Sequence, residues 1–392
     1  MRILIGTDTF TPDVNGAAVF TARLADGLAE RGHDVHVVAP STDRRSRVVA
    51  GDVTEHRVAS LRWSRRHPLR VVDPVRADAV VAAAVADVAP DVVHVQGHVL
   101  VGRRLLRRAA AAGVASVATN HVMPENIAAQ VPIPARWQEP MWAAAYRDLA
   151  RVLDAADVVT APTQRACDLL AERAGLHRAR PISCGIDAAR FGSLRRHRRP
   201  DGPVRLLFVG RLEKEKRIGE LVDAVVGLPD RLDVRLDVVG DGTMRRAWAA
   251  RAAASGRPDR FDFRGHVGDV ELLHAYADAD VFCMPSTAEL QSLATLEAMC
   301  AGTAVVAADA MALPHLVRPG VNGELYRPGD VAELGAHLTT LVDDTRRRDA
   351  YAAAGRLIAE GHGLAATLRA FEGVYEEVVA ARRPHRRLGL AS

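Results

Sequence analysis

The chain has 392 residues, which is too long for one average core and suits two domains of ordinary size. Hydrophobic residues make up 48% of it, aromatic residues 4% and charged residues 26%, a composition typical of a globular protein and not of a fibrous or disordered one. The net charge is only +4, from 52 basic and 48 acidic residues, so the composition does not favour nucleic acid as a partner.

The N-terminus and the cysteines both predict a cytoplasmic protein. Residues 1–10 run directly into an apolar strand without the long apolar core of a signal peptide, and no run approaches about 18 apolar residues. The cysteines, Cys167, Cys184, Cys283 and Cys300, lie far apart and lack metal-ligand spacing. We therefore expect reduced thiols in buried positions.

Short apolar strands alternate with amphipathic helices in the first half of the chain, which is the rhythm of a parallel sheet with helical crossovers. The predicted strands are Arg2–Gly6, Asp34–Val38, Val92–Val95, Ala115–Ala118 and Val158–Thr160, and the predicted helices are Val19–Glu30, Ala77–Val88, Gly102–Ala112 and Trp137–Ala155. One doubly wound domain accounts for them. The basic stretch 194–202 has no apolar periodicity and is interpreted as a linker.

A second series of strands and helices begins after this linker. Its predicted strands are Val204–Val209, Leu236–Val239, Phe261–Phe263, Val281–Met284 and Ala304–Val306, and the helices Val331–Val342, Arg346–Glu360 and Leu364–Ala380 follow without an intervening strand. The sequence therefore predicts an α/β protein with two Rossmann-like, doubly wound parallel-sheet domains that face a central cleft. The expected domains are 1–195 and 196–363, followed by the C-terminal helix 364–392.

The chemistry is expected within 286–302, where Glu289 and Glu297 stand eight residues apart. Ser286 and Thr287 supply helix-start residues after a short apolar strand, so the sequence predicts a helix that begins near them. On such a helix the two carboxylates would lie roughly 12 Å apart along the axis. They could accept hydrogen bonds from sugar hydroxyls while the helix terminus faces a diphosphate. The alternative is an ordinary capped helix with a solvated glutamate.

The loop after the second domain's first strand carries two cations. Arg211 follows Gly210 directly after the strand, and a guanidinium fixed there can bind a diphosphate bidentately. Lys216 adds a second positive charge, so the two could stabilise a departing nucleoside diphosphate without a metal ion. The alternative is a solvated loop of mixed charge, which fits Lys214 better than Arg211.

Other strand ends carry candidate ligand-binding residues. Gly240 and Asp241 follow one strand and Val267 lies just after another, where backbone groups could bind a nucleobase edge or form plain turns. Gly16 precedes the first helix and permits close backbone approach to a phosphate or sugar, with a turn glycine as the alternative. His121 follows a first-domain strand and could hydrogen-bond a sugar, although a lone histidine is more often structural.

Several familiar site patterns are absent from the sequence. There is no dinucleotide fingerprint G-x-G-x-x-G, no P-loop, no Ser-His-Asp order and no zinc-ligand spacing. Asp278 and Asp280 match D-x-D only formally, because the first ends a predicted helix and the second starts a buried strand. The sequence therefore predicts neither a metal ion nor a dinucleotide cofactor.

Together these segments resemble the family 4 retaining glycosyltransferases of the GT-B fold, over nearly the whole chain. The matching positions are Glu289 and Glu297 of the E-x7-E element with Leu296-Glu297-Ala298-Met299 and Gly302, Gly210-Arg211 with Lys216, Gly185-Ile186-Asp187 with Phe191, and Asn15-Gly16. The resemblance implies that the C-terminal helix 364–392 packs back on the first domain.

The resemblance also implies site roles. Glu289 would contact the hydroxyls of the transferred sugar, Glu297 the ribose, the Val267 backbone the base, and His121 the sugar near its reactive face. Many members of the family carry glycine where Ser292 stands. The implied catalytic group is His121, Glu289, Arg211 and Lys216. The implied donor-binding set is Gly16, Gly210, Arg211, Lys216, Gly240, Asp241, Val267, Glu289, Leu290, Gln291, Ser292, Leu293 and Glu297.

The implied activity is metal-independent, retaining transfer of a hexose from a UDP or GDP sugar. Segment 119–126 and the Glu289–Ser292 variant resemble bacterial transferases that glycosylate diacylglycerol or related lipids, so a glycolipid precursor is the expected acceptor. A soluble small molecule is the alternative. The arginine-rich segments 61–70 and 103–108 could contact an anionic membrane or be solvated surface. Other function classes are a nucleotide-sugar epimerase or hydrolase, and a silent sugar-nucleotide binder.

Overall fold

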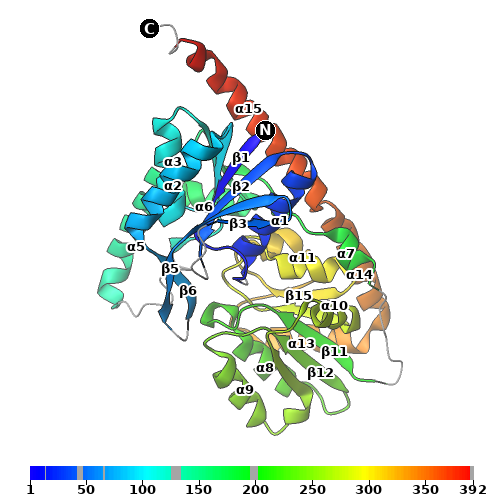
Figure 1. Ribbon diagram of the computed structural model, residues 1–392. Helices are drawn as coiled ribbons and strands as arrows, with labels where there is room; N and C mark the ends of the chain where they lie inside the picture. Colours follow the sequence, from blue (N-terminus) through cyan, green and yellow to red (C-terminus); the bar gives the residue numbers. More distant parts are fainter. Residues whose placement is uncertain (14, 42–46, 65–66, 125–133, 195–201, 389–392) are drawn as a thin grey trace. The chain divides into compact units, whose positions relative to one another are not determined.

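The computed structural model describes residues 1–13, 15–41, 47–64, 67–124, 134–194 and 202–388. The chain forms two compact units, each built around its own sheet (Figure 1). The N-terminal unit comprises Met1–Ser183 with Thr367–Ser392, and the C-terminal unit comprises Cys184–Ala366. The chain therefore passes between units at Ser183/Cys184, upstream of the predicted linker. Residues 195–201 of that linker lie outside the described residues.

An eight-stranded sheet forms the N-terminal unit, in the order β10-β9-β8-β7-β1-β2-β4-β3. Neighbouring strands are parallel except for the antiparallel edge pair β3 and β4. The strands are β1 (Arg2–Gly6), β2 (Asp34–Pro40), β3 (Arg47–Ala50), β4 (Val53–Val58), β7 (Val92–Val95), β8 (Ala115–Thr119), β9 (Val158–Ala161) and β10 (Arg180–Pro181). A separate antiparallel pair consists of β5 (Ser60–Ser64) and β6 (His67–Val72).

Three helices of this unit begin at side chains that accept backbone hydrogen bonds. The N-cap Asn15 accepts from the amide of Ala18 at 3.0 Å, and Thr163 accepts from that of Ala166 at 3.1 Å. Such capping satisfies amides that have no partner within the helix. The helices are α1 (Gly16–Glu30), α2 (Pro74–Val88), α3 (Leu100–Ala111), α5 (Ala135–Leu153), α6 (Gln164–Ala174) and α15 (Leu364–Leu388).

Most of α15 belongs to the N-terminal unit, although it follows the C-terminal unit in sequence. Its Glu372 accepts two hydrogen bonds from the guanidinium of Arg31, at 2.8 and 2.7 Å. Its Phe371 lies against Phe20 of α1, with ring centroids 6.0 Å apart. The end of the chain is thus packed on elements formed by its beginning (Figure 1).

A six-stranded, wholly parallel sheet forms the C-terminal unit, in the order β13-β12-β11-β14-β15-β16. Its strands are β11 (Val204–Val209), β12 (Val234–Val239), β13 (Phe261–Gly265), β14 (Val281–Met284), β15 (Ala304–Ala308) and β16 (Gly323–Tyr326). Its helices are α7 (Ala188–Gly192), η1 (Lys214–Lys216), α8 (Ile218–Val226), α9 (Arg245–Ala253), η2 (Pro258–Arg260), α10 (Asp269–Asp278), α11 (Leu293–Cys300), α12 (Leu313–Leu316), α13 (Val331–Asp343) and α14 (Thr345–Glu360).

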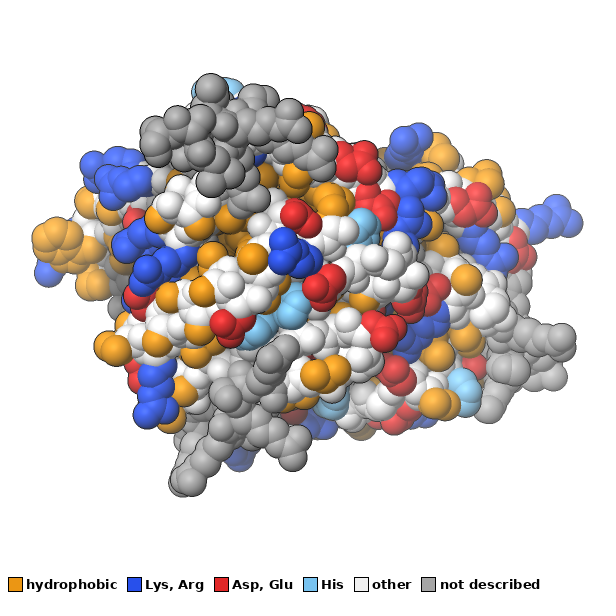
Figure 2. Space-filling model, turned by 45° about the horizontal axis from the view of Figure 1, so that its top comes forward, with side chains coloured by type: hydrophobic (Ala, Val, Ile, Leu, Met, Phe, Trp, Pro, Cys, Tyr) orange, Lys and Arg blue, Asp and Glu red, His pale blue; other side chains and the backbone are white. Residues whose placement is uncertain are grey.

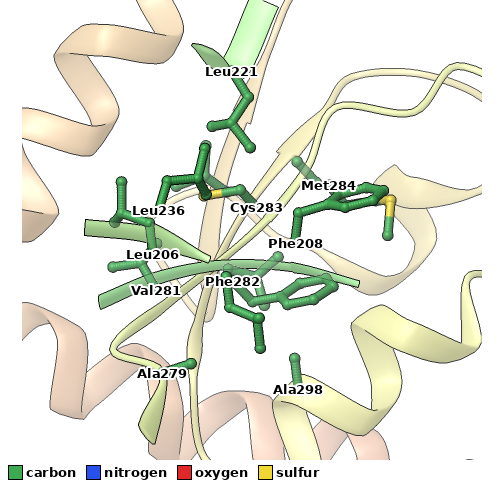
Figure 3. Close-up of a cluster of buried hydrophobic side chains, with 14 of the residues drawn as sticks. Leu206, Phe208, Leu221, Leu236, Ala279, Val281, Phe282, Cys283, Met284 and Ala298 are labelled. Carbon is green, nitrogen blue, oxygen red and sulfur yellow. The ribbon is translucent and has the colours of Figure 1, made fainter. Parts of the chain in front are cut away.

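The two central strands of this sheet carry almost continuous apolar sequence because both of their faces are covered by helices. Phe208 of β11 and Phe282 of β14 are fully buried. Leu221 of α8 lies on one side of the strands and Ala298 of α11 on the other (Figure 3). Each buried side chain of this size contributes roughly 1.5–3 kcal/mol to folding, so the core holds the strand ends in fixed register.

The predicted α/β architecture with two doubly wound parallel sheets is confirmed. Strands 2–6, 92–95, 204–209 and 281–284 have the predicted bounds, and the other predicted strands are also present. The sequence analysis predicted no strand within 47–72, at 180–181 or at 323–326, where β3 to β6, β10 and β16 lie. These strands are short, and β3 and β16 are sheet edges, so they lack the long apolar runs that identify central strands.

Charges of both signs are interspersed on the face shown in Figure 2, where lysine and arginine side chains lie among aspartate and glutamate. Many arginines are paired: Arg103 bonds to Asp148 and Arg108 to Asp78, each at 2.5 Å. These exposed pairs contribute little stability but place much of the arginine excess beside carboxylates. No helix in the described ranges is both long and apolar enough to cross a membrane.

Candidate active site

Loops at the centre of the C-terminal sheet carry the predicted charged residues. Strand order runs from β11 outward to β13 on one side and from β14 outward to β16 on the other, so the topology reverses between β11 and β14. Ligands of doubly wound sheets bind beyond the carboxyl ends of strands at such a reversal. Arg211 and Lys216 follow β11, and Glu289 follows β14. The predicted donor residues thus occupy the switch point.

Three of the predicted residues form one charged group. The ammonium of Lys216 donates to Oε1 of Glu289, and both side chains are largely buried. Arg211 lies near enough for its charge to lower the pKa of Glu289, and its guanidinium is 3.4 Å from Oε1 of Glu215. The structure therefore brings Arg211, Lys216 and Glu289 together, as their positions at strand ends predict.

The carboxylate of Glu289 is held ionised by this group. Burial by itself would raise its pKa, but the charge of Lys216, hydrogen bonds from Lys216 and Ser286, and the charge of Arg211 hold the pKa below its usual value. An ionised carboxylate can only accept hydrogen bonds. Glu289 is therefore suited to bind hydroxyl groups.

The prediction that a helix begins near Ser286 is wrong, because residues 285–292 form a loop and α11 begins at Leu293. The hydroxyl of Ser286 accepts from the amide of Ala288 at 3.3 Å, a local turn that competes with helix formation. The amide of Thr287 donates to the carbonyl of Glu215, and the carbonyl of Glu289 accepts from Ala312. Glu289 thus lies on an anchored loop, and the helical separation of roughly 12 Å does not apply.

The N-terminus of α11 lies directly after this loop. The first amides of a helix have no intrahelical partner and favour a negatively charged ligand. Ser292, the residue before the helix, has a positive φ of 73°. Glycine adopts this conformation without strain, which explains the glycine that the family resemblance leads one to expect here. The Ser292 hydroxyl is 2.8 Å from that of Thr295.

Close contacts between glycine loops fix the course of the segment after β11. A Cβ atom on Gly240 would lie 1.9 Å from the carbonyl oxygen of Gly210. The amide of Leu212 donates to the carbonyl of Asp241 at 2.9 Å. The carboxylate of Glu213, which the sequence analysis did not select, accepts from the amide and hydroxyl of Thr243. The loops after β11 and β12 are therefore held together, and the first of them carries Arg211.

Other predicted donor residues have defined partners in the same unit. Glu297 is buried on α11, and its carboxylate accepts a 3.0 Å hydrogen bond from the hydroxyl of Tyr276. The side chain of Gln291 accepts from the amide of Cys184 at 2.8 Å, so it has a structural partner besides its predicted backbone role. Leu290 is buried, and Val267 packs against the core. Nothing in the sequence pattern identified Tyr276 as the partner of Glu297.

Gly16 and His121 belong to the N-terminal unit. Gly16 is the first residue of α1, and a Cβ atom on it would meet no atom within 4 Å. His121 follows β8, with its Nε2 2.8 Å from Oε1 of Gln96 and its ring 5.0 Å from that of Phe20. Gln96, which directly follows β7, was missed, although its position at a strand end was a usable signal. Within the described residues, no group of three or more His, Cys, Asp or Glu is arranged to hold a metal ion.

Comparison with known proteins identifies the family of this chain. Residues 14–190 match the model described as Glycosyltransferase Family 4, and residues 192–357 match that of the group 1 glycosyl transferases. A GDP-mannose-dependent alpha-mannosyltransferase of Mycobacterium tuberculosis is 31% identical over 96% of this chain and 97% of its own. The chain belongs to glycosyltransferase family 4.

Two further likenesses bear on this glycosyltransferase. A phosphatidyl-myo-inositol mannosyltransferase of Mycobacterium leprae is 34% identical over 44% of this chain and 46% of its own. The solved structure of a sucrose-phosphate synthase from Thermosynechococcus elongatus superimposes with a TM-score of 0.82, at 21% identity, over 97% of this chain and 100% of that one. The fold of this glycosyltransferase is therefore GT-B, as predicted.

The positive φ of Ser292 predicts the relative stability of two variants of this glycosyltransferase. Ser292→Gly and Ser292→Ala both lose the hydroxyl contact with Thr295, but only glycine adopts the backbone conformation without strain. We expect Ser292→Gly to exceed Ser292→Ala by about 1 kcal/mol in unfolding free energy, measured by reversible denaturation. Equal stability of the two variants would contradict the assigned φ.

The contact beneath Arg211 predicts a larger effect. Gly240→Ala should lower the unfolding free energy by about 2–3 kcal/mol, because the new methyl group overlaps the carbonyl of Gly210. Gly268→Ala is the matched control, since a Cβ atom there meets nothing within 4 Å. Thermal denaturation of both variants checks this, and a Gly240→Ala variant as stable as its control would show that the loops are not in close contact.

Proposed function

We propose that this glycosyltransferase transfers a hexose from a nucleoside diphosphate sugar to an acceptor hydroxyl, with retention of anomeric configuration. The observation that carries the proposal is the group at the switch point, where Arg211, Lys216 and the ionised Glu289 precede the N-terminus of α11. Cations and helix amides fit a diphosphate, while a carboxylate held ionised fits hydroxyl groups. The two chemistries side by side match a nucleotide sugar.

Donor binding follows from the charges of the group. The guanidinium of Arg211 and the ammonium of Lys216 bind the diphosphate, and its oxygens face the first amides of α11. Glu289 then accepts hydrogen bonds from the sugar hydroxyls, and the buried Glu297 binds the ribose. Backbone groups near Gly240, Asp241 and Val267 contact the base. In this arrangement Lys216 neutralises Glu289 before the donor binds and the diphosphate afterwards.

Transfer takes place on one face of the sugar. The bond from the anomeric carbon to the diphosphate oxygen breaks, the bond to the acceptor oxygen forms, and a diphosphate oxygen takes the acceptor's proton. Negative charge grows on the diphosphate as it leaves, so Arg211 and Lys216 stabilise the transition state more than the ground state. The cations supply the neutralisation that a divalent metal supplies in other transferases, and we propose that no metal is needed. His121 contacts the sugar near its reactive face.

GDP-mannose is the leading donor in this proposal, and UDP-sugars are the alternative. GDP-mannose is supported by the mycobacterial relative, which aligns with nearly the whole chain and is described as GDP-mannose-dependent. A thermal-shift panel of GDP, UDP and their sugars identifies the donor, because a ligand that binds only the folded state raises its apparent stability.

The proposed acceptor is a glycolipid precursor, supported by the partial likeness to a phosphatidyl-myo-inositol mannosyltransferase. A lipid acceptor requires peripheral membrane contact, for which the exposed Trp137 on α5 and Arg107 on α3 of the N-terminal unit are available. A soluble small molecule is the alternative acceptor. Transfer of radiolabelled sugar into an organic-soluble product identifies the first class, and label only in aqueous product identifies the second.

Two neighbouring lysines on the same turn provide a matched test of the donor site. Lys216→Met should lower kcat/KM by a factor of about 100 or more, because the departing diphosphate loses a positioned cation. Lys214→Met removes the same charge from an exposed position two residues away and should stay within about twofold of the wild type. Steady-state kinetics with the identified donor measures both.

The proposal also requires that Arg211→Ala and Glu297→Ala abolish donor use in a folded protein. Circular dichroism and thermal melting establish that each variant is folded. Unchanged turnover in either folded variant, or equal losses in the two lysine variants, would contradict the proposed donor site. Incubation with donor alone is the companion control, because an epimer formed without acceptor would indicate an epimerase.

The charge balance at Glu289 predicts a pH effect. In the wild type the lowered pKa keeps this carboxylate ionised, so donor binding should be constant from about pH 8 to about pH 5.5 with respect to this group. Lys216→Met leaves burial unopposed by its largest partner, so the pKa of Glu289 rises. Residual donor affinity of this variant should then fall as the pH drops through the raised pKa. Isothermal titration across this range measures the difference, and parallel pH profiles would contradict it.

A further inference from the structure

A chain of buried polar side chains links the C-terminal helix to the central strands of the N-terminal unit. The hydroxyl of Tyr375, on α15, is 2.7 Å from Nδ1 of His94 on β7. Nε2 of the same imidazole is 2.6 Å from the hydroxyl of Thr119 on β8, which is 2.7 Å from that of Thr160 on β9. All four side chains are fully or almost fully buried. Both ring nitrogens of His94 therefore have hydroxyl partners at hydrogen-bond distance.

Gln96 connects this chain to His121. Its side-chain nitrogen lies 3.3 Å from Nδ1 and 3.2 Å from Nε2 of His94. Because these two distances are nearly equal, the NH₂ group lies over the face of the ring and is not in line with either nitrogen. The amide oxygen lies on the other side, 2.8 Å from Nε2 of His121. The side chain of Gln96 is itself buried, at 5% exposure.

The direction of each contact follows from the chemistry of the groups. The face of a neutral imidazole attracts an amide N–H and repels a carbonyl oxygen, so His94 selects the orientation in which the NH₂ group of Gln96 faces it. The oxygen of Gln96 is then turned to His121. A carbonyl oxygen only accepts hydrogen bonds, so Nε2 of His121 carries the proton.

We propose that Gln96 is a positioning residue that holds His121 in the neutral tautomer protonated on Nε2, with its own amide oriented by His94 and, through His94, by Tyr375 of α15. The arrangement of the histidines rests on contacts within one unit. Only its consequence for catalysis rests on the proposed function, in which His121 contacts the transferred sugar. A fixed tautomer defines which nitrogen donates and which accepts, so the sugar meets one defined partner.

Burial keeps both imidazoles neutral, which this arrangement requires. Burial lowers the pKa of His121 to about 4. The pKa of His94 is lowered to about 3, mainly by burial and to a smaller extent by the charge of His121. Uncharged aromatic rings pack against both imidazoles, Phe20 against His121 and Phe371 against His94, with ring centroids 5.0 Å apart in each pair. These ring contacts restrain the orientation of both imidazoles.

The test is 15N spectroscopy of histidine side chains in the full-length protein, with His121→Gln used to assign the His121 signals. The wild type should show the Nε2-protonated tautomer of His121. In Gln96→Met the signals should move toward a mixture of tautomers. In Gln96→Glu the carboxylate still accepts from Nε2 but also favours the imidazolium, so the pKa of His121 should rise by about one or two pH units.

Gln164→Glu is the matched charge control, because Gln164 lies at the exposed start of α6 and bonds only to Asp168 among its described side-chain contacts. It should leave the His121 signals unchanged. A wild type protonated on Nδ1, or a Gln96→Met spectrum identical to that of the wild type, overturns the proposal. Gln96→Glu provides a second reading if the methionine variant does not fold.

Kinetics separates this inference from the proposed function. Gln96→Met should lower kcat about tenfold with the donor KM within about twofold, and the activity of Gln96→Glu should acquire a dependence on pH that follows the raised pKa of His121. Altered tautomers with unchanged kcat would overturn the catalytic part of the inference. A wild type that shows the expected tautomer but transfers no sugar from any donor contradicts the proposed function and still supports the assignment of Gln96.

Discussion

The ion pair between Lys216 and Glu289 joins two loops that lie 73 positions apart in sequence, and the proposed donor site depends on it. Removing two charges from water is costly, and their attraction repays that cost only where geometry and further hydrogen bonds are favourable. The surrounding residues meet this condition. Arg217, with a φ of 51°, turns the chain directly after Lys216, and its guanidinium pairs with Glu220. Glu220 in turn accepts from the hydroxyl of Tyr326 at 3.0 Å. The turn that follows Lys216 is thereby tied to β16, which carries Tyr326.

A parallel sheet makes this pairing possible because all its strands end at the same edge. The apolar core fixes the register of β11 and β14, which places their following loops next to each other. Glycine is then required where loops cross, as at Gly240 against the carbonyl of Gly210. The core thus contributes to function indirectly. It holds two charged loops close enough for each to compensate the other's burial, which neither loop could achieve alone.

The alignment of parallel strand ends at one edge of a sheet also explains which parts of the molecule were predictable from sequence. Continuous apolar runs identified the central strands, and the residues after them included Arg211 and Glu289. The helix prediction at Ser286 was wrong because of local side-chain chemistry. The Ser286 hydroxyl forms a turn where a helix N-cap was expected. Partners contributed by distant elements carried no sequence signal: the hydroxyl of Tyr276 reaches Glu297, and that of Tyr375 reaches His94, 281 positions away. Periodicity locates strand ends, but it does not show which side chains from other elements meet there.

Two predicted site residues, Glu289 and His121, are held in their charge states by opposite means. In the C-terminal unit, opposite charges keep Glu289 ionised although it is buried. In the N-terminal unit, burial lowers the pKa of His121, whose Nε2 lies 2.8 Å from the amide oxygen of Gln96 and whose ring lies against that of Phe20. Positioned charges suit a site for a polyanion, because they neutralise charge that grows during departure. Neutral donors and acceptors suit hydroxyl groups, whose binding they make insensitive to pH above the lowered pKa values. The charged group around Glu289 and the neutral imidazole of His121 therefore fit the proposed reaction, in which a diphosphate departs and sugar hydroxyls are bound.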